Sequence, residues 1–383
     1  MLFAADTPDI SGQDALKKKF ERREPRSIPT RNAGEQPNRV RAESRAPAKA
    51  PAKTSPKPAR PDPAAAQPVE TRPLLKRSGD LPAERVPVIL SSQEPGEFHL
   101  IDSGAGLKLE QYGPYRIVRP EAQALWQPTL GPHVWDNADA IFTGDTDEDG
   151  MGRWRFPREA LGETWPMALL GVDFLGRFTA FRHVGVFPEQ LVHWAFVKEQ
   201  AEKAGRPIKV LNLFGYTGVA SLVAASAGAE VTHVDASKKA IGWARENQAL
   251  SRLDKAPIRW ICEDAMKFIL REERRGNRYD IILADPPKFG RGPNGEVFHL
   301  FEQLPLMLDV CREILSPNAI GLVLTAYSIR ASFYSIHELM RETMRGAGGA
   351  VESGELVIRE AGLDGHAPGR TLSTSLFSRW VRT

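Results

Sequence analysis

Hydrophobic and polar positions follow two different patterns along the 383-residue chain. From about residue 207, short apolar runs recur with helix-length segments between them. The runs are IKVLNLF, AEVTHVD, IRWIC, YDIILAD and IGLVLTA. Buried parallel strands are continuously apolar, and repeated alternation of strand and helix is typical of a parallel sheet covered by helices on both faces. The pattern therefore predicts an α/β domain whose ligands bind at the carboxyl ends of the strands.

The end of the chain predicts a different arrangement. GELVIRE and TLSTSLFSRWV follow one another without a helix-length segment, which predicts a closing antiparallel pair. We assign residues 186–383 to the α/β domain.

Residues 85–185 contain shorter apolar signals, separated by Gly, Pro and Asp turns. These signals are EFHLIDSG, LKLEQYG, YRIVRPE, AIFTGD and FTAFRHV, which predict strands of a small β-rich domain. The tract DTDEDGMGRWRF imitates a calcium loop through Asp145, Asp147, Asp149 and Gly150, but Phe156 stands where a bidentate glutamate is needed. We interpret the tract as a solvated turn.

Residues 1–84 differ in composition from the rest. The first 80 residues hold 12 of the 30 prolines and carry 17 Lys or Arg against 10 Asp or Glu. So little apolar surface predicts a disordered basic arm. Residues 81–383 carry 34 Lys or Arg against 38 Asp or Glu, so the basic pI of about 8.8 comes from the arm. Such an arm can hold phosphate backbones without sequence specificity, or it can be a solubilising leader; the composition leaves both open.

Other sequence features bear on location and metals. The two cysteines, Cys262 and Cys311, make no disulfide framework, and no Cys/His cluster has metal-ligand spacing. No apolar run approaches the roughly 18 residues of a membrane span, and the N-terminus lacks a signal-peptide pattern. Asp6, Asp9 and Asp14 argue against a transit peptide. We expect a cytoplasmic protein without a metal site or membrane contact.

Three strand ends carry residues suited to one ligand. Gly215 and Gly218 follow the first strand, where they let the backbone approach a ligand, although the third glycine of a dinucleotide-binding turn is absent. Asp235 ends the second strand, where a carboxylate can accept from both hydroxyls of a ribose. Asp264 follows the third strand and can meet an adenine amino group. A nucleoside without a diphosphate is predicted, and S-adenosylmethionine fits.

Each of these residues also has a purely structural interpretation. The glycines can simply make a tight turn, Asp235 can cap the helix beginning ASKKAIGWA, and Asp264 can cap the helix AMKFILREE. Taken singly, the structural interpretation is favoured. Three such features at three successive strand ends nevertheless favour a shared ligand.

The fourth strand ends in ADPPKFGRG. Asp285 and the carbonyl groups of Pro286 and Pro287 can point into a pocket as acceptors, because proline has no N–H for a sheet ladder. Acceptors hold the hydrogens of a reacting nitrogen and turn its lone pair toward a methyl group. Phe289 can stack on a flat base. The stretch therefore predicts the catalytic end of the site.

Two basic residues follow in the same stretch. Lys288 can attract a neighbouring phosphate through its ammonium charge, and Arg291 can bind one through two parallel hydrogen bonds from its guanidinium. The alternative is an ordinary solvated loop. We expect a flexible basic exit from the pocket.

Four segments together resemble the bacterial large-subunit ribosomal RNA methyltransferases, in the family of the cytosine-C5 and guanine-N7 enzymes. They are LNLFGYTGVASL, HVDASKKAIGWARENQ, ICEDAMKF and DIILADPPKF, and the resemblance covers roughly residues 180–330. It implies a class I S-adenosylmethionine-dependent methyltransferase with a Rossmann-like, seven-stranded sheet, acting on RNA. The family's N-terminal RNA-binding domain of the pseudouridine-synthase type is absent, and the arm takes its place.

The resemblance also implies roles for single residues. The methionine end of the cofactor would be cradled by Phe214, Gly215, Thr217 and Gly218; the ribose would be surrounded by Asp235, Ala236 and Ser237; the adenine would meet Asp264 and Ala265. The family's upstream tyrosine-leucine-aspartate-glutamine-arginine motif is matched loosely at residues 187–191, so Phe187 and Gln190 are expected near the cofactor. The arginine is missing, and His193 is the nearest polar replacement. Asn247, in the family's A-x-x-N helix, is expected to orient the loop after the second strand.

One departure from the family bears on the acceptor atom. Cytosine-C5 enzymes need a thiolate to attack the ring, and in this family the cysteine lies in a turn after the fifth strand. Here that turn reads Thr325, Ala326, Tyr327, Ser328. We therefore expect a nitrogen acceptor, guanine N7 or an exocyclic amine, with Tyr327 as a second ring or a hydrogen-bonding wall.

Other functions remain as alternatives. The acceptor nitrogen can belong to a protein or a small molecule, because Asp-Pro-Pro reads the atom and not the polymer. A non-catalytic RNA-binding protein on the same fold is another possibility. A nicotinamide oxidoreductase is disfavoured by the glycine pattern.

Overall fold

The computed structural model describes residues 72–92, 96–144, 152–327, 331–367 and 369–382. Most of the predicted arm, the calcium-like tract from Asp145 to Gly150, and Ser328 therefore lie outside the described residues. Among the residues that are described, no helix is long and apolar enough to cross a membrane, and no three His, Cys, Asp or Glu side chains gather as a metal site.

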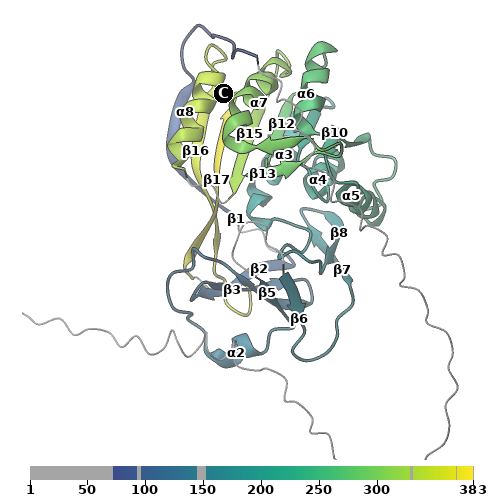
Figure 1. Cartoon of the computed structure of the whole chain (residues 1–383), viewed down its shortest axis with the longest axis vertical. Helices are drawn as coiled ribbons and strands as arrows, with labels where there is room; N and C mark the ends of the chain where they lie inside the picture. The colour runs from purple at the N-terminus through teal and green to yellow at the C-terminus, as the bar shows by residue number, and fades with distance from the viewer. Residues whose placement is uncertain (1–71, 93–95, 145–151, 328–330, 368, 383) are drawn as a thin grey trace, which may run out of the picture. The chain divides into compact units, whose positions relative to one another are not determined.

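An eight-stranded mixed sheet organises the structure (Figure 1). In spatial order its strands are β1 (Ala83–Ser92), β16 (Ala350–Arg359), β17 (Thr371–Val381), β15 (Gly321–Tyr327), β12 (Ile281–Ala284), β9 (Lys209–Leu213), β10 (Glu230–Asp235) and β11 (Ile258–Cys262). The pairs among β9, β10, β11, β12 and β15 are parallel. β17 is antiparallel to both β15 and β16. The five parallel strands and the closing antiparallel pair predicted from the sequence are confirmed.

β1 raises the strand count from the predicted seven to eight. It pairs in parallel with β16 at the edge of the sheet, with a register shift between Arg85 and Val88. Every residue of β1 is exposed or only partly buried, as expected of an edge strand with little core to cover. For this reason its sequence carries a weaker apolar signal than the central strands.

The segment before β1 also differs from the prediction, which placed it in the arm. Arg72 pairs with Glu273 at 2.8 Å, and Arg77 pairs with Asp309 and with Glu313, the latter at 2.8 Å. These carboxylates lie on two helices of the large sheet, α6 (Ala265–Arg274) and α7 (Leu300–Glu313). The folded part therefore includes basic residues that composition alone assigned to the arm.

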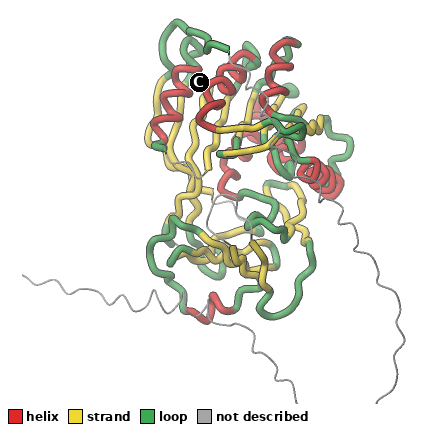
Figure 2. Tube along the Cα trace, in the orientation of Figure 1, coloured by secondary structure: helices red, strands yellow, loops and turns green. Residues whose placement is uncertain are grey.

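Helices lie on both faces of the large sheet (Figure 2). On one face, α3 (Leu191–Lys203) and α4 (Val219–Ser226) share a core with Val210, while α5 (Lys238–Leu250) packs on β10 and β11. On the other face, α6, α7 and α8 (Phe333–Thr343) share a second core with Leu211. Neighbouring residues of one strand thus enter different cores, which explains why these strands are continuously apolar.

A five-stranded sheet is built from the earlier part of the chain. Its order is β2 (Phe98–Gly104), β3 (Leu107–Tyr112), β4 (Tyr115–Pro120), β5 (Ala140–Gly144) and β6 (Gly152–Arg155), with α2 (Pro132–Asp136) between β4 and β5 and the hairpin β7 (Thr164–Leu169) and β8 (Val172–Arg177) after β6. Four of the predicted strands are confirmed as β2 to β5. The fifth, FTAFRHV, is wrong, because β8 ends at Arg177. Phe178 instead packs in an aromatic cluster, with its ring 4.5 Å from that of Trp165, so the alternating pattern there reflects loop packing.

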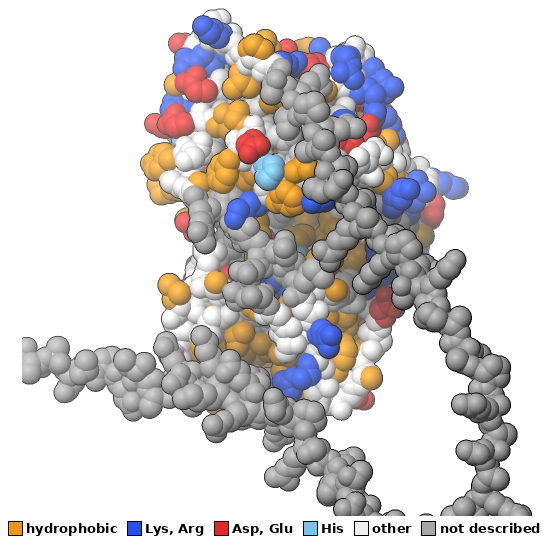
Figure 3. All heavy atoms as spheres, in the orientation of Figure 1, with side chains coloured by type: hydrophobic (Ala, Val, Ile, Leu, Met, Phe, Trp, Pro, Cys, Tyr) orange, Lys and Arg blue, Asp and Glu red, His pale blue; other side chains and the backbone are white. Residues whose placement is uncertain are grey.

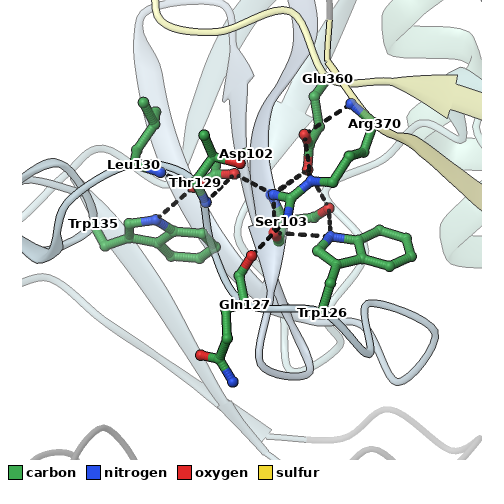
Figure 4. Close-up of polar contacts among 9 residues, drawn as sticks. All are labelled: Asp102, Ser103, Trp126, Gln127, Thr129, Leu130, Trp135, Glu360 and Arg370. Atoms are coloured by element: carbon green, nitrogen blue, oxygen red, sulfur yellow. Dashed lines mark hydrogen bonds and ion pairs between the residues drawn. The ribbon is translucent and has the colours of Figure 1, made fainter. Parts of the chain in front are cut away.

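An ion cluster joins the β16–β17 hairpin to the five-stranded sheet (Figure 4). Arg370 donates hydrogen bonds to Asp102 at 2.8 Å and to Glu360 at 2.9 Å. Glu360 also accepts from the amide and the hydroxyl of Ser103, at 2.9 and 2.6 Å. Asp102 and Glu360 are almost fully buried. Because removing one partner would leave a buried charge uncompensated, the cluster holds the hairpin to this sheet.

Candidate active site

A cavity of about 460 Å³ lies at the carboxyl ends of the parallel strands. Its volume falls in the range of about 300 to 1,000 Å³ that is usual for small-molecule sites. The predicted site residues that line it are Phe187, Gln190, Phe214, Asp235, Ala236, Ser237, Asp264, Ala265, Asp285, Pro286, Pro287, Lys288, Phe289, Arg291 and Tyr327. The fold thus brings together residues that are up to 140 positions apart in the chain.

A second cavity, of about 40 Å³, adjoins the first and shares Phe187, Gln190, Phe214, Tyr216 and Asp285 with it. Gly215 and Thr217 line this smaller space. The Thr217 hydroxyl donates to the Gly185 carbonyl at 2.6 Å, so its first role is to hold the turn. Any ligand group in this space must be small.

Gly218 lines neither of these two cavities. Its φ is +81°, and a Cβ there would lie 2.9 Å from the Cβ of Ala244 and from the ring of Trp260. The backbone conformation and the lack of space account for glycine at this position. The structural interpretation of Gly218 is therefore sufficient.

The turn between β9 and α4 is strained. Phe214 and Tyr216 have φ values of +57° and +51°, in the left-handed region that non-glycine residues rarely adopt. Each such residue costs about 1 to 2 kcal/mol. Strain of this kind clusters at ligand sites, and both side chains line the two cavities.

Asp235 connects the turns after β9 and β10. Its two carboxylate oxygens accept from the amides of Tyr216 and Ser237, at 2.9 and 2.8 Å. The cap of α5 is Ser237, whose hydroxyl accepts from Ala240, so the alternative that Asp235 caps this helix is wrong. Burial raises the pKa of Asp235. Each oxygen keeps a lone pair for a ligand hydroxyl.

Asp264 does cap a helix, as its structural interpretation proposed. Oδ1 accepts from the Lys267 amide at 2.9 Å at the start of α6. The residue nevertheless lines the large cavity, and burial raises its pKa. Capping and ligand contact are compatible here, because the carboxylate has a second oxygen.

Asp285 stands directly after β12 and is half-buried, beside the buried Pro286. Gln190, at the end of the 3₁₀ turn η1 (Pro188–Gln190), donates from Nε2 to Asp285 Oδ2 at 2.5 Å. Burial raises the pKa of Asp285 to about 7; the Gln190 hydrogen bond opposes the shift, and the charge of Glu189 adds to it. Burial also raises the pKa of Glu189. With Asp235 and Asp264, the cavity thus holds four carboxyl groups whose pKa is raised by burial.

The expected flexible exit is instead a short hairpin, β13 (Phe289–Arg291) and β14 (Val297–His299). It is fixed by the Gly292 amide, which donates to the Glu296 carbonyl at 2.8 Å, and by an ion pair of 2.6 Å between Lys267 and Glu296. Phe289 is 48% exposed. An exposed aromatic ring on a paired hairpin therefore stands at the entrance of the cavity.

Several lining residues were not assigned a site role from the sequence. They are His183, Glu189, Tyr216, Val234, Glu263, Gly290, Gly292, Phe298 and Ser375. Tyr216 lies inside the Gly215–Gly218 turn, so the glycine motif that predicted this turn could also have predicted a site role for Tyr216. Ser375 enters the site only because it pairs with Tyr327 in the β15–β17 ladder, which depends on strand register.

Asn247 holds a different loop from the one predicted. Its Nδ2 donates to the Thr217 carbonyl at 2.9 Å, and its Oδ1 accepts from the Leu175 amide at 2.9 Å. It thus orients the turn after β9, not the loop after β10, and it lines neither cavity. The motif correctly predicted that Asn247 orients a loop, but it placed that loop after β10 instead of after β9.

Neither cysteine lines the large cavity. Cys311 is fully buried in α7, and burial raises its pKa to about 12. Cys262, at the end of β11, faces the Ala236 carbonyl at 3.6 Å. Neither cysteine therefore contributes to the cavity that contains Asp285.

Residues 147–350 match the sequence profile of the S-adenosylmethionine-dependent methyltransferases. The chain belongs to this family. A solved methyltransferase from Agrobacterium tumefaciens, described as S-adenosylmethionine dependent, is 78% identical, with 81% of this chain and 98% of that one covered and a TM-score of 0.79.

More distant relatives share only part of the methyltransferase. The ribosomal RNA large subunit methyltransferase K/L of Shewanella frigidimarina is 34% identical over 150 residues, and the ribosomal RNA large subunit methyltransferase I of Aeromonas salmonicida is 32% identical over 137 residues. These alignments cover 39% and 36% of this chain, and 20% and 32% of the relatives. The chain therefore spans a fifth to a third of the length of these relatives.

The site residues fit the cofactor of this family. Asp235 retains lone pairs for two hydroxyls, as a ribose requires. His193 is 1% exposed, neither of its ring nitrogens has a hydrogen-bond partner among the described residues, and it lines the smaller cavity. A buried ring without hydrogen-bond partners is suited to bind a small polar group of a ligand. S-adenosylmethionine has a ribose and a polar methionyl end.

Proposed function

We propose that the methyltransferase acts on a nitrogen of a ribosomal RNA base, in the cytoplasm. The position of Asp285 carries the proposal. Its carboxyl group lies in the same cavity as Asp235 and Asp264, with Phe289 at the entrance and no cysteine in the lining. That arrangement suits a flat acceptor that attacks through nitrogen.

The residues of this chain would orient the acceptor. Bound S-adenosylmethionine supplies a methyl group on a positively charged sulfur. Asp285 and the carbonyl of Pro286 would accept the hydrogens of the nitrogen, so that its lone pair points at the methyl group. Positioning of this kind supplies most of the rate in a displacement that needs no covalent intermediate. With a pKa of about 7, Asp285 can also take a proton that an amine loses after transfer.

RNA is supported as the polymer by the names of the partial relatives and by the entrance of the cavity. Phe289 offers an exposed ring for stacking, and Lys288 and Arg291 lie beside it on exposed positions. On the face drawn in Figure 3, basic and acidic side chains are interspersed. Phosphate contacts would therefore come from these two residues and from the basic sequence of the arm.

The test compares ribosomal RNA modification maps from cells with and without the gene. One methylated nucleotide should disappear without the gene and return when the purified protein is added to that RNA with S-adenosylmethionine. Asp285→Ala should abolish the transfer while cofactor affinity stays within a few-fold. Normal methylation by this variant would contradict the assignment of Asp285.

An acceptor nitrogen on a protein or a small molecule is the second candidate. Asp285 and Pro286 would contact only the reacting nitrogen, so they do not distinguish RNA from other molecules that carry such a nitrogen. Labelled methyl groups that appear in protein and not in RNA of a cell extract would favour it. A non-catalytic RNA-binding role would be favoured if removing residues 1–71 abolished RNA binding and no methyl transfer to any substrate were found.

A further inference from the structure

Arg182 is a buried guanidinium without an acidic partner. The residue is 8% exposed, and no carboxylate lies within ion-pair distance of it in the described part of the chain. Of the nearby acids, Glu110 pairs with Arg119 and Glu121 pairs with Lys108. Glu189 lines the same small cavity as Arg182 but makes no ion pair with it. A buried charge is costly to keep without a partner. The position of Arg182 therefore calls for a role.

The five-stranded sheet fixes the backbone of Arg182. Arg119 of β4 donates from Nη1 to the Arg182 carbonyl at 3.0 Å. Arg119 is itself held by two hydrogen bonds to Glu110, at 2.7 and 2.8 Å, and by one to the Tyr112 hydroxyl at 2.7 Å. All three of these side chains are buried. The support for Arg182 is thus rigid and comes from outside the large sheet.

The space beside Arg182 is too small for a substrate group. A cavity of about 20 Å³ is lined by Arg182, Glu189, Tyr327 and the two basic residues Lys108 and Arg119. A single water needs roughly 10 to 15 Å³, so a phosphate does not fit. Arg182 is also absent from the lining of the 460 Å³ cavity. It therefore acts through another residue.

That residue is Tyr327, which lines both cavities. Arg182 donates from Nη2 to the Tyr327 hydroxyl oxygen, and its guanidinium carbon lies 5.4 Å from the centre of the Tyr327 ring. A guanidinium can only donate, so the phenol oxygen must accept, and the phenol O–H remains free to donate elsewhere. Among the described residues, no acceptor is bonded to that O–H.

We infer that Arg182 is a positioning residue that fixes Tyr327 as a hydrogen-bond donor to the acceptor base. The inference rests on the proposed function. Asp285 and Glu189 line the same cavity and, when ionised, can only accept. Tyr327 supplies the complementary donor, so the ligand is a base edge with an unprotonated ring nitrogen or a carbonyl oxygen beside the reacting nitrogen. The five-stranded sheet thereby contributes to base recognition without touching the base.

The experiment compares Arg182→Met, Arg182→Lys, Tyr327→Phe and the Arg182→Met/Tyr327→Phe double variant. The substrate is ribosomal RNA from cells that lack the gene, and kcat, KM, S-adenosylmethionine affinity and Tm are measured. Arg379→Met is the control, because Arg379 makes a 2.7 Å ion pair with Glu352 and lies outside the large cavity. It should lower Tm and leave kcat unchanged.

Arg182→Met and Tyr327→Phe should each lower kcat about 10- to 100-fold, as expected when a buried hydrogen bond is lost, with unchanged cofactor affinity. The double variant should be no slower than Tyr327→Phe, because both changes remove one interaction. Arg182→Lys should recover part of the rate, since an ammonium group also donates.

Three results would overturn the inference. They are a normal kcat in Tyr327→Phe, a double variant whose losses multiply, and an Arg182→Met variant that loses only Tm, like the control. Tyr327→Phe removes a single hydroxyl and keeps the test valid if Arg182→Met does not fold. Wild-type protein that transfers no methyl group to RNA would reject the proposed function and this inference together, whereas normal transfer by Arg182→Met would reject the inference alone.

Discussion

Gln190 donates a hydrogen bond of 2.5 Å to Asp285, and this contact ties the 3₁₀ turn after Phe187 to the end of β12. It is the interaction that opposes the rise in the pKa of Asp285, since burial and the charge of Glu189 both favour the neutral acid. The protonation of Asp285, which we propose orients the acceptor, therefore depends on the side-chain amide of Gln190.

Methyl transfer should depend on pH through this contact. If ionised Asp285 accepts the hydrogens of the nitrogen, kcat should rise with pH and reach half its maximum near pH 7. Gln190→Leu removes the donor that favours the carboxylate, so its midpoint should move to higher pH. A pH profile of kcat with saturating substrates measures both midpoints. An unshifted midpoint would mean that another group controls the rate.

The same pKa predicts how stability depends on pH. The folded-state pKa of about 7 lies above the ordinary value of 3.8, so the folded protein binds this proton more tightly than the unfolded chain. The stabilisation is complete below about pH 4 and is lost as pH rises through 7. Asp285→Asn should therefore raise stability at pH 8, by about 2 to 4 kcal/mol at most, and change it little at pH 4. Thermal melts at both pH values test this, with the exposed Asp173→Asn as the control.

Gly218→Ala should damage the fold rather than the binding site. The left-handed φ costs about 1 to 2 kcal/mol, and the Cβ contacts at 2.9 Å with Ala244 and Trp260 add to that, for about 2 to 4 kcal/mol in total. Gly228→Ala is the matched control, since its φ is +87° but no atom lies within 4 Å of a Cβ there. Urea melts should show the larger loss for Gly218. A large drop in cofactor affinity of still-folded Gly218→Ala protein would show that the cofactor reaches this residue after all.

His193→Leu should separate stability from cofactor binding. Burial lowers the pKa of His193 to about 3, so the ring is neutral, and its two nitrogens lack partners among the described residues. Replacing an unsatisfied buried polar group with an apolar one should stabilise the unliganded protein by about 1 kcal/mol. If the methionyl end of S-adenosylmethionine satisfies the ring, the same change should weaken cofactor affinity. Melting with and without cofactor measures both effects, and unchanged affinity would remove His193 from the binding site.

Phe289→Ala should weaken RNA binding. A stacked base contributes about 1 to 3 kcal/mol, which corresponds to a loss of roughly 5- to 150-fold in affinity. Phe301→Ala is the matched control, because Phe301 is 55% exposed but does not line the cavity. Fluorescence titration with a single-stranded RNA measures the RNA affinity of both variants. Cofactor affinity, measured alongside, shows whether a loss is specific to RNA. Equal losses in both variants would argue against stacking in the cavity entrance.

The sequence predicted the elements whose signal is local. β9, β10, β12 and β15 are mostly apolar because both faces of each are buried. β11 lies at an edge and is only partly buried, but its short run IRWIC still marks it. The residues that follow these parallel strands line one cavity at the carboxyl ends of the strands. β1 escaped prediction because an edge strand needs no such run. Arg182 and Ser375 escaped because their positions depend on a contact from β4 and on the register between β15 and β17. Gly218 and Asn247 both belong to motifs that correctly predicted a turn or a loop contact. The motifs did not predict which groups these two residues contact.

The ion cluster of Arg370, Glu360 and Asp102 has a consequence for the order in which the protein folds. Asp102 belongs to β2, whereas Glu360 and Arg370 flank the last turn of the β16–β17 hairpin. During synthesis, the five-stranded sheet is complete long before residue 370 is made. Until then, Asp102 has no guanidinium to pair with. The attachment of the first-made sheet to the hairpin is thus one of the last events available to a growing chain, and a chain that ended before residue 370 would leave this buried carboxylate without its guanidinium partner.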